Sequence, residues 1–148
     1  MKINKLYIYK DKGKKGIGAD KLQLTENKGI EGDRFARGGD RQVSIIDRRL
    51  LNAIEKNPDR FGVCAGRIKS NIVTEGCRVA GLRTGDRLVI GDAVLEITDE
   101  IRPCVDDCPV AEDGIACQIK YGTLFAKVVK SGEIHENDTF EIRIKTQQ

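Results

Sequence analysis

The sequence is poor in several residue types. Among its 148 residues there are no tryptophan, one histidine, one methionine and three prolines, and aromatic residues make up only 5%. Few aromatic side chains are available for base stacking and the net charge is only +3, so nucleic acid is disfavoured as a partner. No apolar run approaches the roughly 18 residues that cross a bilayer, and the first residues carry no cleavage signal. We therefore expect a cytoplasmic protein with no membrane partner.

Length and composition place the chain among globular proteins. Hydrophobic residues make up 39% and charged residues 33%, which is typical of a water-exposed fold with an apolar core. A chain of 148 residues buries enough surface to fold without disulfides or structural metals. No linker, low-complexity stretch or repeat divides it, so we expect residues 1–148 to form a single domain.

Short alternating segments between turn residues predict a mainly β fold. The two runs within residues 86–98 meet at Gly91-Asp92, a pair that favours a two-residue hairpin turn. Residues 123–144 repeat the sequence of strand, glycine-containing turn and strand. Further strands are expected at 5–9, 21–25, 41–47 and 71–74. Many short strands and little helix favour a compact barrel or sandwich.

One helix is expected, over residues 47–57. Asp47 is suited to the N-cap position, and Asn57 precedes a proline that would end the helix. Between them, three apolar residues share one helical face: Leu50, Leu51 and Ile54.

Gly-Asp occurs four times, and the pairs are interpreted differently. Gly85-Asp86 and Gly91-Asp92 are typical of tight turns, because both residue types tolerate turn dihedrals. Gly32-Asp33 and Gly39-Asp40 belong to residues 29–44, which are also rich in arginine. Glycine lets backbone N–H groups approach a ligand, and arginine binds phosphate or carboxylate with two parallel donors. Residues 29–44 are therefore a candidate anion site.

Three of the five cysteines lie in "IRPCVDDCPVAEDGIAC", residues 101–117, with C-x3-C-x8-C spacing. A reducing cytoplasm and an odd total disfavour structural disulfides, which leaves a metal site or reactive thiols. A tetrahedral zinc site could take three ligands from the cysteines and a fourth from His135, which otherwise suits a solvated hairpin. Alternatively, the thiols handle sulfur or sense oxidants, with the second or third cysteine pairing with the first. The three cysteines are Cys104, Cys108 and Cys117.

Six segments, in order, resemble the MOSC domain, a family named for the C-terminal part of molybdenum-cofactor sulfurases. The cysteine spacing is similar to that of small stand-alone bacterial members. The resemblance implies a compact β-barrel with few peripheral helices. It also implies a ligand, the molybdenum cofactor (molybdopterin) or a precursor, which is a pterin dithiolene with a terminal phosphate. The segments are "GIEGDRF" (29–35), "RQVSII" (41–46), "NIVTEG" (71–76), "LRTGDRLVIGDAVLEIT" (82–98), "RPC" (102–104) and "GTLFAKVVKSGEI" (122–134).

The resemblance also implies site residues. The cysteine of the family's Pro-Cys motif corresponds to Cys104, which would carry sulfur as a persulfide or ligate molybdenum. The segment "RIKSN" supplies two basic residues and an asparagine for the pterin and its phosphate, and two arginine-containing motifs suit the same anion. The residues expected to hold the cofactor are Arg34, Arg41, Arg67, Lys69 and Asn71.

Two departures shape the expected function. Phe35 stands where many members have histidine, so proton transfer at that position is lost. The chain also lacks the additional N-terminal β domain of the larger reductases, which favours a binding or carrier role in cofactor maturation or transfer. A sulfur donor or a molybdoenzyme would then be the protein partner. Catalysis, if present, would be sulfur transfer or molybdenum-dependent reduction of an N-hydroxylated substrate. The alternatives are a zinc-stabilised interaction module and a thiol redox sensor.

Overall fold

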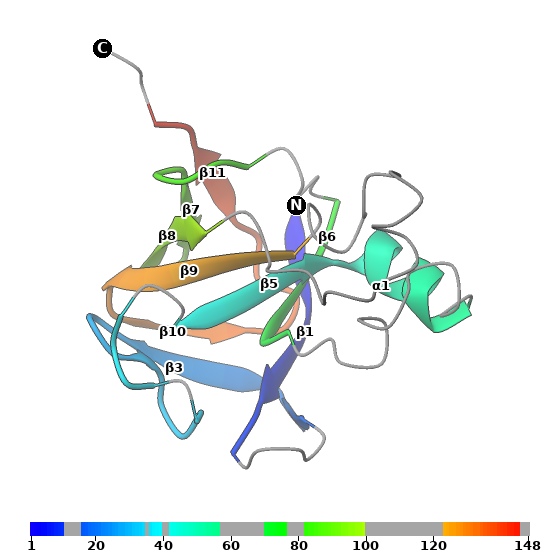
Figure 1. Cartoon of the computed structure of the whole chain (residues 1–148), viewed down its shortest axis with the longest axis horizontal. Coiled ribbons are helices and arrows are strands. Elements are labelled where there is room, and N and C mark those ends of the chain that lie inside the picture. The colour runs from blue at the N-terminus through cyan, green and yellow to red at the C-terminus, as the bar shows by residue number, and fades with distance from the viewer. Residues whose placement is uncertain are drawn as a thin grey trace, which may run out of the picture.

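The structure is a computed structural model of the chain, and it describes residues 1–10, 16–34, 36–39, 42–56, 70–76, 82–99 and 123–145. Within these ranges the chain is mainly β, with eleven strands and one helix (Figure 1). The mainly β class expected from the alternating patterns is therefore confirmed. The cysteine segment and the basic residues Arg41, Arg67 and Lys69 lie outside the described residues.

Two sheets contain all the strands of the described ranges. The larger sheet is antiparallel except for its β5–β6 pair. In spatial order its strands are β11 (Glu141–Arg143), β7 (Arg87–Ile90), β8 (Ala93–Asp99), β9 (Thr123–Lys130), β5 (Val43–Asp47), β6 (Ile72–Glu75), β1 (Lys2–Ile8) and β2 (Ile17–Ala19). The smaller sheet has the order β10 (Gly132–His135), β3 (Lys21–Thr25) and β4 (Gly29–Ile30).

The main hydrophobic core lies between residues of both sheets. On β3, Leu22 and Leu24 are buried while the alternate Lys21 and Gln23 are exposed, as the period-two pattern predicts. Strands of the larger sheet contribute more apolar side chains, among them Ile3, Leu6, Ile45, Ile72, Leu88, Leu95, Leu124 and Val128. Burial of these side chains is the main term that holds the two sheets together.

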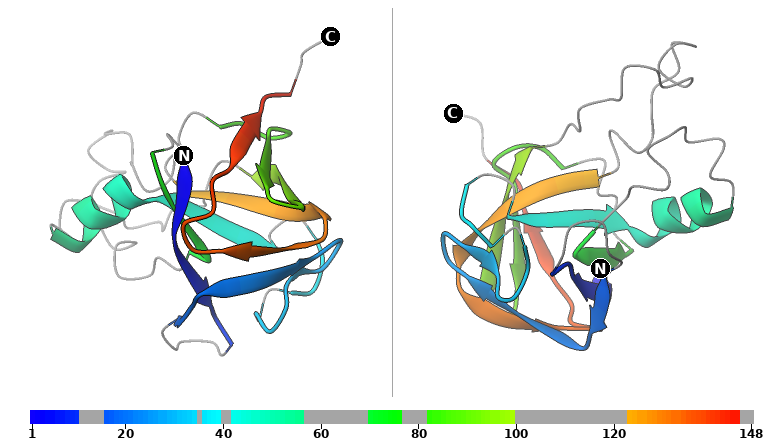
Figure 2. Two further views of the ribbon diagram at one scale, coloured as in Figure 1. Left: turned by 180° about the vertical axis from the view of Figure 1, so that it is seen from behind. Right: turned by 60° about the horizontal axis from the view of Figure 1, so that its bottom comes forward.

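The helix α1 (Arg48–Lys56) projects from one side of the larger sheet (Figure 2). Its buried residue Ile54 packs with Ile46 and Val73 in a second apolar cluster, with Leu50 and Leu51 partly buried against it. Asp47 accepts hydrogen bonds from backbone N–H groups of the first turn, so it caps the helix as the sequence predicts. This cluster covers one part of the outer face of β5 and β6. None of the helices in the described ranges has the length and apolar character needed to span a membrane.

The sheets do not close into the expected barrel within the described residues. β2 and β11 end the larger sheet, and each is only three residues long. Near β11 the chain meets the start of β1 through an isolated bridge between Lys2 and Thr139, without a continuous ladder. Within the described residues, pairing therefore does not continue around a closed barrel.

One expected hairpin is found, and a second pair of strands is arranged differently. β7 and β8 pair across the Gly91 turn, where a φ of +57° suits glycine. The strands expected in residues 123–144 are present, but β10 pairs with β3 rather than with β9. A Cβ added to Gly132 would lie 2.6 Å from the backbone nitrogen of Ala93. The missing side chain therefore lets the chain turn sharply from one sheet into the other.

Candidate functional site

Four segments that are distant in sequence meet at the start of the parallel β5–β6 pair. They are the end of β1, the turn after β4, the start of β5 and the two residues before β6. Their polar side chains are buried, and all except the Ser70 hydroxyl are hydrogen-bonded to one another or to nearby backbone. We call this group the Asn71 cluster; it consists of Tyr9, Asp33, Ser44, Ser70 and Asn71.

Asn71 is the centre of the cluster and is only 2% exposed. Its side-chain Oδ1 accepts hydrogen bonds from the backbone N–H of Ser44 at 3.0 Å and from the Ser44 hydroxyl at 3.2 Å. Its Nδ2 donates to the Tyr7 carbonyl oxygen at 3.2 Å and to Asp33 Oδ1 at 3.1 Å. An amide offers two donors and two acceptor sites, so protein groups occupy all four. Asn71 thereby ties β1, β5 and the turn after β4 together.

Asp33 brings Arg34 to this cluster. Asp33 Oδ1 also accepts a hydrogen bond from the backbone N–H of Tyr9 at 2.8 Å, and the Arg34 N–H donates to the Tyr9 carbonyl oxygen at 2.8 Å. Gly32 has a φ of +88°, a conformation that L side chains rarely adopt, and it directs the chain into this turn. Two predicted cofactor residues, Arg34 and Asn71, are therefore connected through Asp33 and Tyr9.

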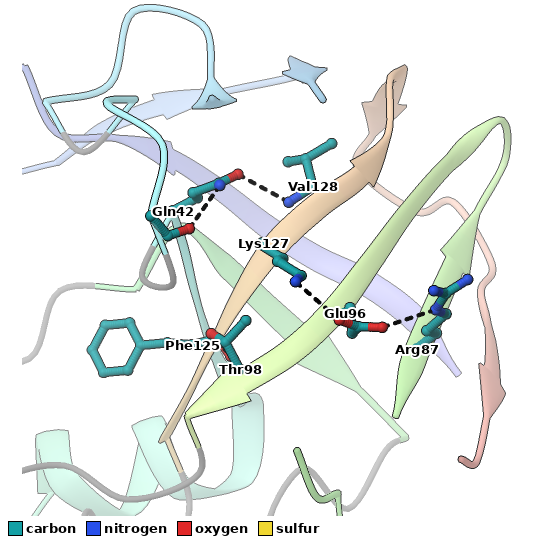
Figure 3. Close-up of polar contacts among 8 residues, drawn as sticks. Gln42, Arg87, Glu96, Thr98, Phe125, Lys127 and Val128 are labelled. Carbon is teal, nitrogen blue, oxygen red and sulfur yellow. Dashed lines mark hydrogen bonds and ion pairs between the residues drawn. The ribbon is translucent and has the colours of Figure 1, made fainter. Parts of the chain in front are cut away.

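The glycine-rich segment does not offer all of its backbone N–H groups to a ligand. Those of Asp33, Arg34, Ala36 and Gly38 donate instead to carbonyl oxygens of the protein. Gln42 fixes the end of the segment, because its Nε2 donates to the Gly39 carbonyl and its Oε1 accepts from the Val128 N–H (Figure 3). These four N–H groups are therefore not available to an anion, which weakens the interpretation of residues 29–44 as an anion site made by backbone N–H groups. The arginine side chains remain as its candidate donors.

Strand register relates the described residues that flank the cysteine segment to the Asn71 cluster. Asp99, the last residue of β8, pairs with Phe125, and Phe125 pairs with Ser44, which bonds to Asn71. Three interstrand steps separate Asp99 from Asn71, which is roughly 14 Å at the usual spacing of strands. Asp99 and Thr123, the described residues on either side of residues 100–122, therefore lie on adjacent strands, and Thr123 pairs with Ile46 two residues beyond Ser44.

Phe125 and its neighbours lie on the outer face of the larger sheet, at the strand position where Phe125 pairs with Asp99 and Ser44. Its side chain alternates with the buried Leu124 and Ala126, and Thr98 Oγ1 donates to its carbonyl oxygen at 3.3 Å. On the same stretch of sheet, Glu96 pairs with Lys127 at 3.3 Å and with Arg87 at 3.2 Å (Figure 3). These three exposed or half-exposed side chains satisfy one another, so they carry no independent site.

The predicted site residues have three outcomes. Arg34 and Asn71 are brought together, whereas Arg41, Arg67 and Lys69 lie outside the described residues. Cys104, Cys108 and Cys117 also lie outside them, so neither the sulfur role nor the zinc role is tested. In the described part of the chain, no group of three His, Cys, Asp or Glu side chains is arranged to hold a metal ion.

His135 is exposed, as expected of a solvated residue, although β10 pairs with β3 and, in the described part of the chain, forms no hairpin with its chain neighbours. It lies on β10 and is exposed, with Nε2 2.8 Å from Glu133 Oε1 and Nδ1 3.5 Å from Asp138 Oδ2. Strand β10 pairs with β3 in the smaller sheet, whereas β5 and β6 pair in the larger one. As a zinc ligand, His135 stays a prediction.

Sequence reasoning missed four members of the cluster, among them Tyr9, which was expected only as part of a strand. Asp33 was noted only as part of a Gly-Asp pair, although an acidic residue directly before a candidate anion-binding arginine was a usable signal. Ser44 and Ser70 carried no signal, because a serine at a strand end is usual in any β protein. Their importance depends on contacts with residues 27 or more positions away.

The matching family model is the MOSC domain, over residues 32–141. Among solved structures, the YuaD protein of Bacillus subtilis is similar with a TM-score of 0.73 and 21% identity, covering 98% of this chain and 96% of that one. YiiM from Escherichia coli is similar with a TM-score of 0.63 and 21% identity, covering 100% of this chain and 72% of that one. YiiM from Geobacillus stearothermophilus has a TM-score of 0.65 and 16% identity, covering 95% and 74%.

No curated protein matches the chain. The similarity to solved structures, at 21% identity or less, concerns the fold. The family model covers most of the sequence and includes the Asn71 cluster from Asp33 onward. The chain belongs to the MOSC domain family.

Proposed function

We propose that the protein binds the molybdenum cofactor or a precursor and carries sulfur for it, or contacts its molybdenum, through Cys104. The family is linked to proteins that resemble molybdenum-cofactor sulfurases. The observation that supports the proposal is the hydrogen-bonded connection of Arg34 and Asn71 through Asp33 and Tyr9. Strand pairing then links Ser44, the partner of Asn71, through Phe125 to Asp99, the last described residue before the cysteine segment.

The residue types of the predicted site fit such a ligand. Arg34 supplies a permanent positive charge for a phosphate, and Arg41, Arg67 and Lys69 adjoin the described ends of β5 and β6 in sequence. A cysteine thiolate is a soft ligand suited to molybdenum and is the form of cysteine that accepts sulfur. When bound, the cofactor would supply a pterin dithiolene and its metal or sulfur chemistry. The chain would supply charge neutralisation, a thiol and a rigid support.

The Asn71 cluster is the support. Its amide is saturated by protein groups, so the proposed contribution of Asn71 is to fix Arg34 and the starts of β5 and β6 relative to one another. Placing ligand contacts on strands that are locked by hydrogen bonds keeps them in position before the ligand arrives.

Elemental analysis tests the proposal. The protein would be purified without oxygen from a host that makes the molybdenum cofactor, together with Cys104→Ser and with Cys77→Ser, a cysteine outside the C-x3-C-x8-C segment, as the matched control. We expect stoichiometric molybdenum in the wild type and in Cys77→Ser, and its loss in Cys104→Ser.

The other outcomes separate the alternatives. Stoichiometric zinc without molybdenum would overturn the proposal in favour of a zinc-stabilised module, and chelation should then unfold the protein. If neither metal is found, the form of the proposal in which Cys104 contacts molybdenum is excluded. Mass spectrometry of Cys104 would then decide whether it carries a persulfide. A protein with neither metal nor persulfide would contradict both forms of the proposal.

A further inference from the structure

Ser70 has a buried hydroxyl without a hydrogen-bond partner. The residue is 5% exposed, and in the part of the chain that the structure describes its Oγ is the one buried side-chain polar atom without a partner. Burying a hydroxyl without a hydrogen bond is unfavourable, and native proteins contain few such groups. A polar group kept at such a position is commonly explained by a function, because a smaller apolar residue would fit the same space at no such cost.

The surroundings of Ser70 are otherwise well satisfied. The next residue, Asn71, uses its whole amide, and the Ser44 hydroxyl both donates to Asn71 Oδ1 and accepts from the Asn71 N–H at 3.1 Å. The Tyr9 hydroxyl donates to the Ser70 carbonyl oxygen at 3.5 Å, a long contact that leaves the Ser70 hydroxyl unused. The unsatisfied atom therefore lies within a rigid polar group, next to two predicted cofactor-binding residues, rather than in a loosely packed region.

Tyr9 is itself held in place beside Ser70. A Cβ on Gly16 would lie 2.7 Å from Tyr9 Cζ, so the ring rests against a residue that has no side chain. The Tyr9 N–H and carbonyl oxygen are both engaged, with Asp33 and Arg34 respectively. The phenol and the Ser70 backbone are thus positioned before any ligand binds.

We propose that the Ser70 hydroxyl is a direct contact for the uncharged, fused-ring part of the pterin ligand, distinct from the basic residues that would hold its phosphate. This inference rests on the proposed function. A serine hydroxyl both donates and accepts, which matches a heterocycle edge carrying amino, amide and ring-nitrogen groups. An anion is less suited to this position, because the Asp33 carboxylate is bonded to the adjacent Asn71 and like charges in a buried site are unfavourable.

The test compares Ser70→Ala with Thr74→Val. Thr74 lies on β6 and is fully buried, but its hydroxyl has a partner, the Ile46 carbonyl oxygen at 3.4 Å. Removing the unpartnered hydroxyl should raise the melting temperature of the ligand-free protein by roughly 2–4 °C, whereas removing the partnered one should lower it by a similar amount. A merely structural role for Ser70 would give the opposite sign.

Binding is measured with two probes, pterin itself by its fluorescence and inorganic phosphate by competition with a phosphate-bearing pterin. Ser70→Ala should weaken pterin binding by about three- to tenfold, the usual worth of one neutral hydrogen bond, and leave phosphate competition unchanged. Thr74→Val should leave both unchanged.

The outcomes distinguish this inference from the function on which it rests. Wild-type protein that binds neither probe overturns both. Wild-type binding that Ser70→Ala does not weaken overturns the Ser70 contact alone. A Ser70→Ala variant that melts at a lower temperature also overturns it, because the hydroxyl would then have a structural partner such as a buried water. Loss of phosphate competition in place of pterin binding would assign Ser70 to the anion and overturn the proposed division of the site.

Discussion

Asp33 and Asp86 follow glycine in similar turns, yet their hydrogen bonds serve different purposes. Gly32 and Gly85 have φ values of +88° and +96°, and the two aspartates are 7% and 5% exposed. Asp86 accepts from the backbone N–H groups of Arg83 at 2.8 Å and Lys145 at 2.9 Å. Asp33 instead joins a backbone N–H to the side-chain amide of Asn71.

The difference shows that the aspartate of a Gly-Asp turn can either bind backbone groups or join a network of buried side chains. The Asp86 turn fastens the chain near the end of β11 to the turn before β7 through the backbone N–H groups of Arg83 and Lys145. The Asp33 turn continues into a network of buried side chains that reaches β1, β5 and β6. The Gly-Asp pair therefore predicts a turn in both places, and only the neighbours decide whether the turn also supports a site.

The largest effect on stability is expected from Asn71→Ala. The substitution leaves the Ser44 N–H and the Tyr7 carbonyl without their Asn71 partners and removes one donor from Asp33. Buried groups that lose partners cost about 1–3 kcal/mol each, so we expect roughly 3–5 kcal/mol of lost unfolding free energy. Urea unfolding measures it. Asn4→Ala, at a half-buried position where the side chain donates to the exposed Glu75 carboxylate, should change the same quantity by less than about 0.5 kcal/mol. A loss as small as that in Asn71→Ala would show that the cluster is not tightly coupled.

A smaller effect, confined to stability, is expected from Asp86→Ala. It removes two hydrogen bonds to a charged acceptor, and we expect a loss of about 2–4 kcal/mol in unfolding free energy. Pterin and phosphate binding should match the wild type, because this turn lies apart from the Asn71 cluster. Asp92→Ala, in the exposed Gly91-Asp92 turn, is the matched control and should alter neither property. Weakened binding in Asp86→Ala would remove the distinction between the two turns.

The smallest effect on stability concerns Asp47, because hydrogen bonds and a nearby charge offset only part of the effect of burial on the pKa of its carboxyl. Burial raises the pKa of the Asp47 carboxyl, while hydrogen bonds from the Arg49 and Arg48 N–H groups and the Arg49 charge act in the opposite direction. The folded protein therefore holds this proton to higher pH than the unfolded chain does. Its stabilising contribution is complete below the unfolded pKa and is lost as pH rises through the higher folded pKa.

Thermal unfolding of wild type and Asp47→Asn across mildly acidic pH checks this. Asparagine also serves as an N-cap, so the helix should remain. The wild type should lose stability relative to Asp47→Asn as pH increases through that interval. A relative gain instead would mean that the helix N-terminus outweighs burial at this carboxyl.

Local signals in the sequence were sufficient for much of the fold. The Gly91-Asp92 hairpin and the Asp47 cap depend on residues close together in the chain, and both are found. The pairing of β10 with β3 was not foreseen, because it joins residues more than 100 positions apart and depends on how closely Gly132 approaches Ala93.

The candidate site was foreseen only in part. Arg34 and Asn71 were identified through the family resemblance, and the structure connects them through Asp33. The sequence could not show that protein groups take up every hydrogen bond of the Asn71 amide, because these groups come from three other segments. The same holds for Ser70, whose unpartnered hydroxyl is visible only once its burial is known.

The position of β1 has a consequence for how the protein is made. β1 pairs with β6, and the Ile3 N–H and carbonyl bond to Asp138 and Asn137, close to the end of the described chain. During synthesis β1 must therefore wait for Asn137 and Asp138 before its pairing is complete. At usual elongation rates this interval is roughly 7–30 s. During it, the apolar side chains of Ile3 and Leu6, which are fully buried in the folded protein, are not yet packed against their final partners. Chaperones that bind apolar nascent segments would therefore have β1 as a target.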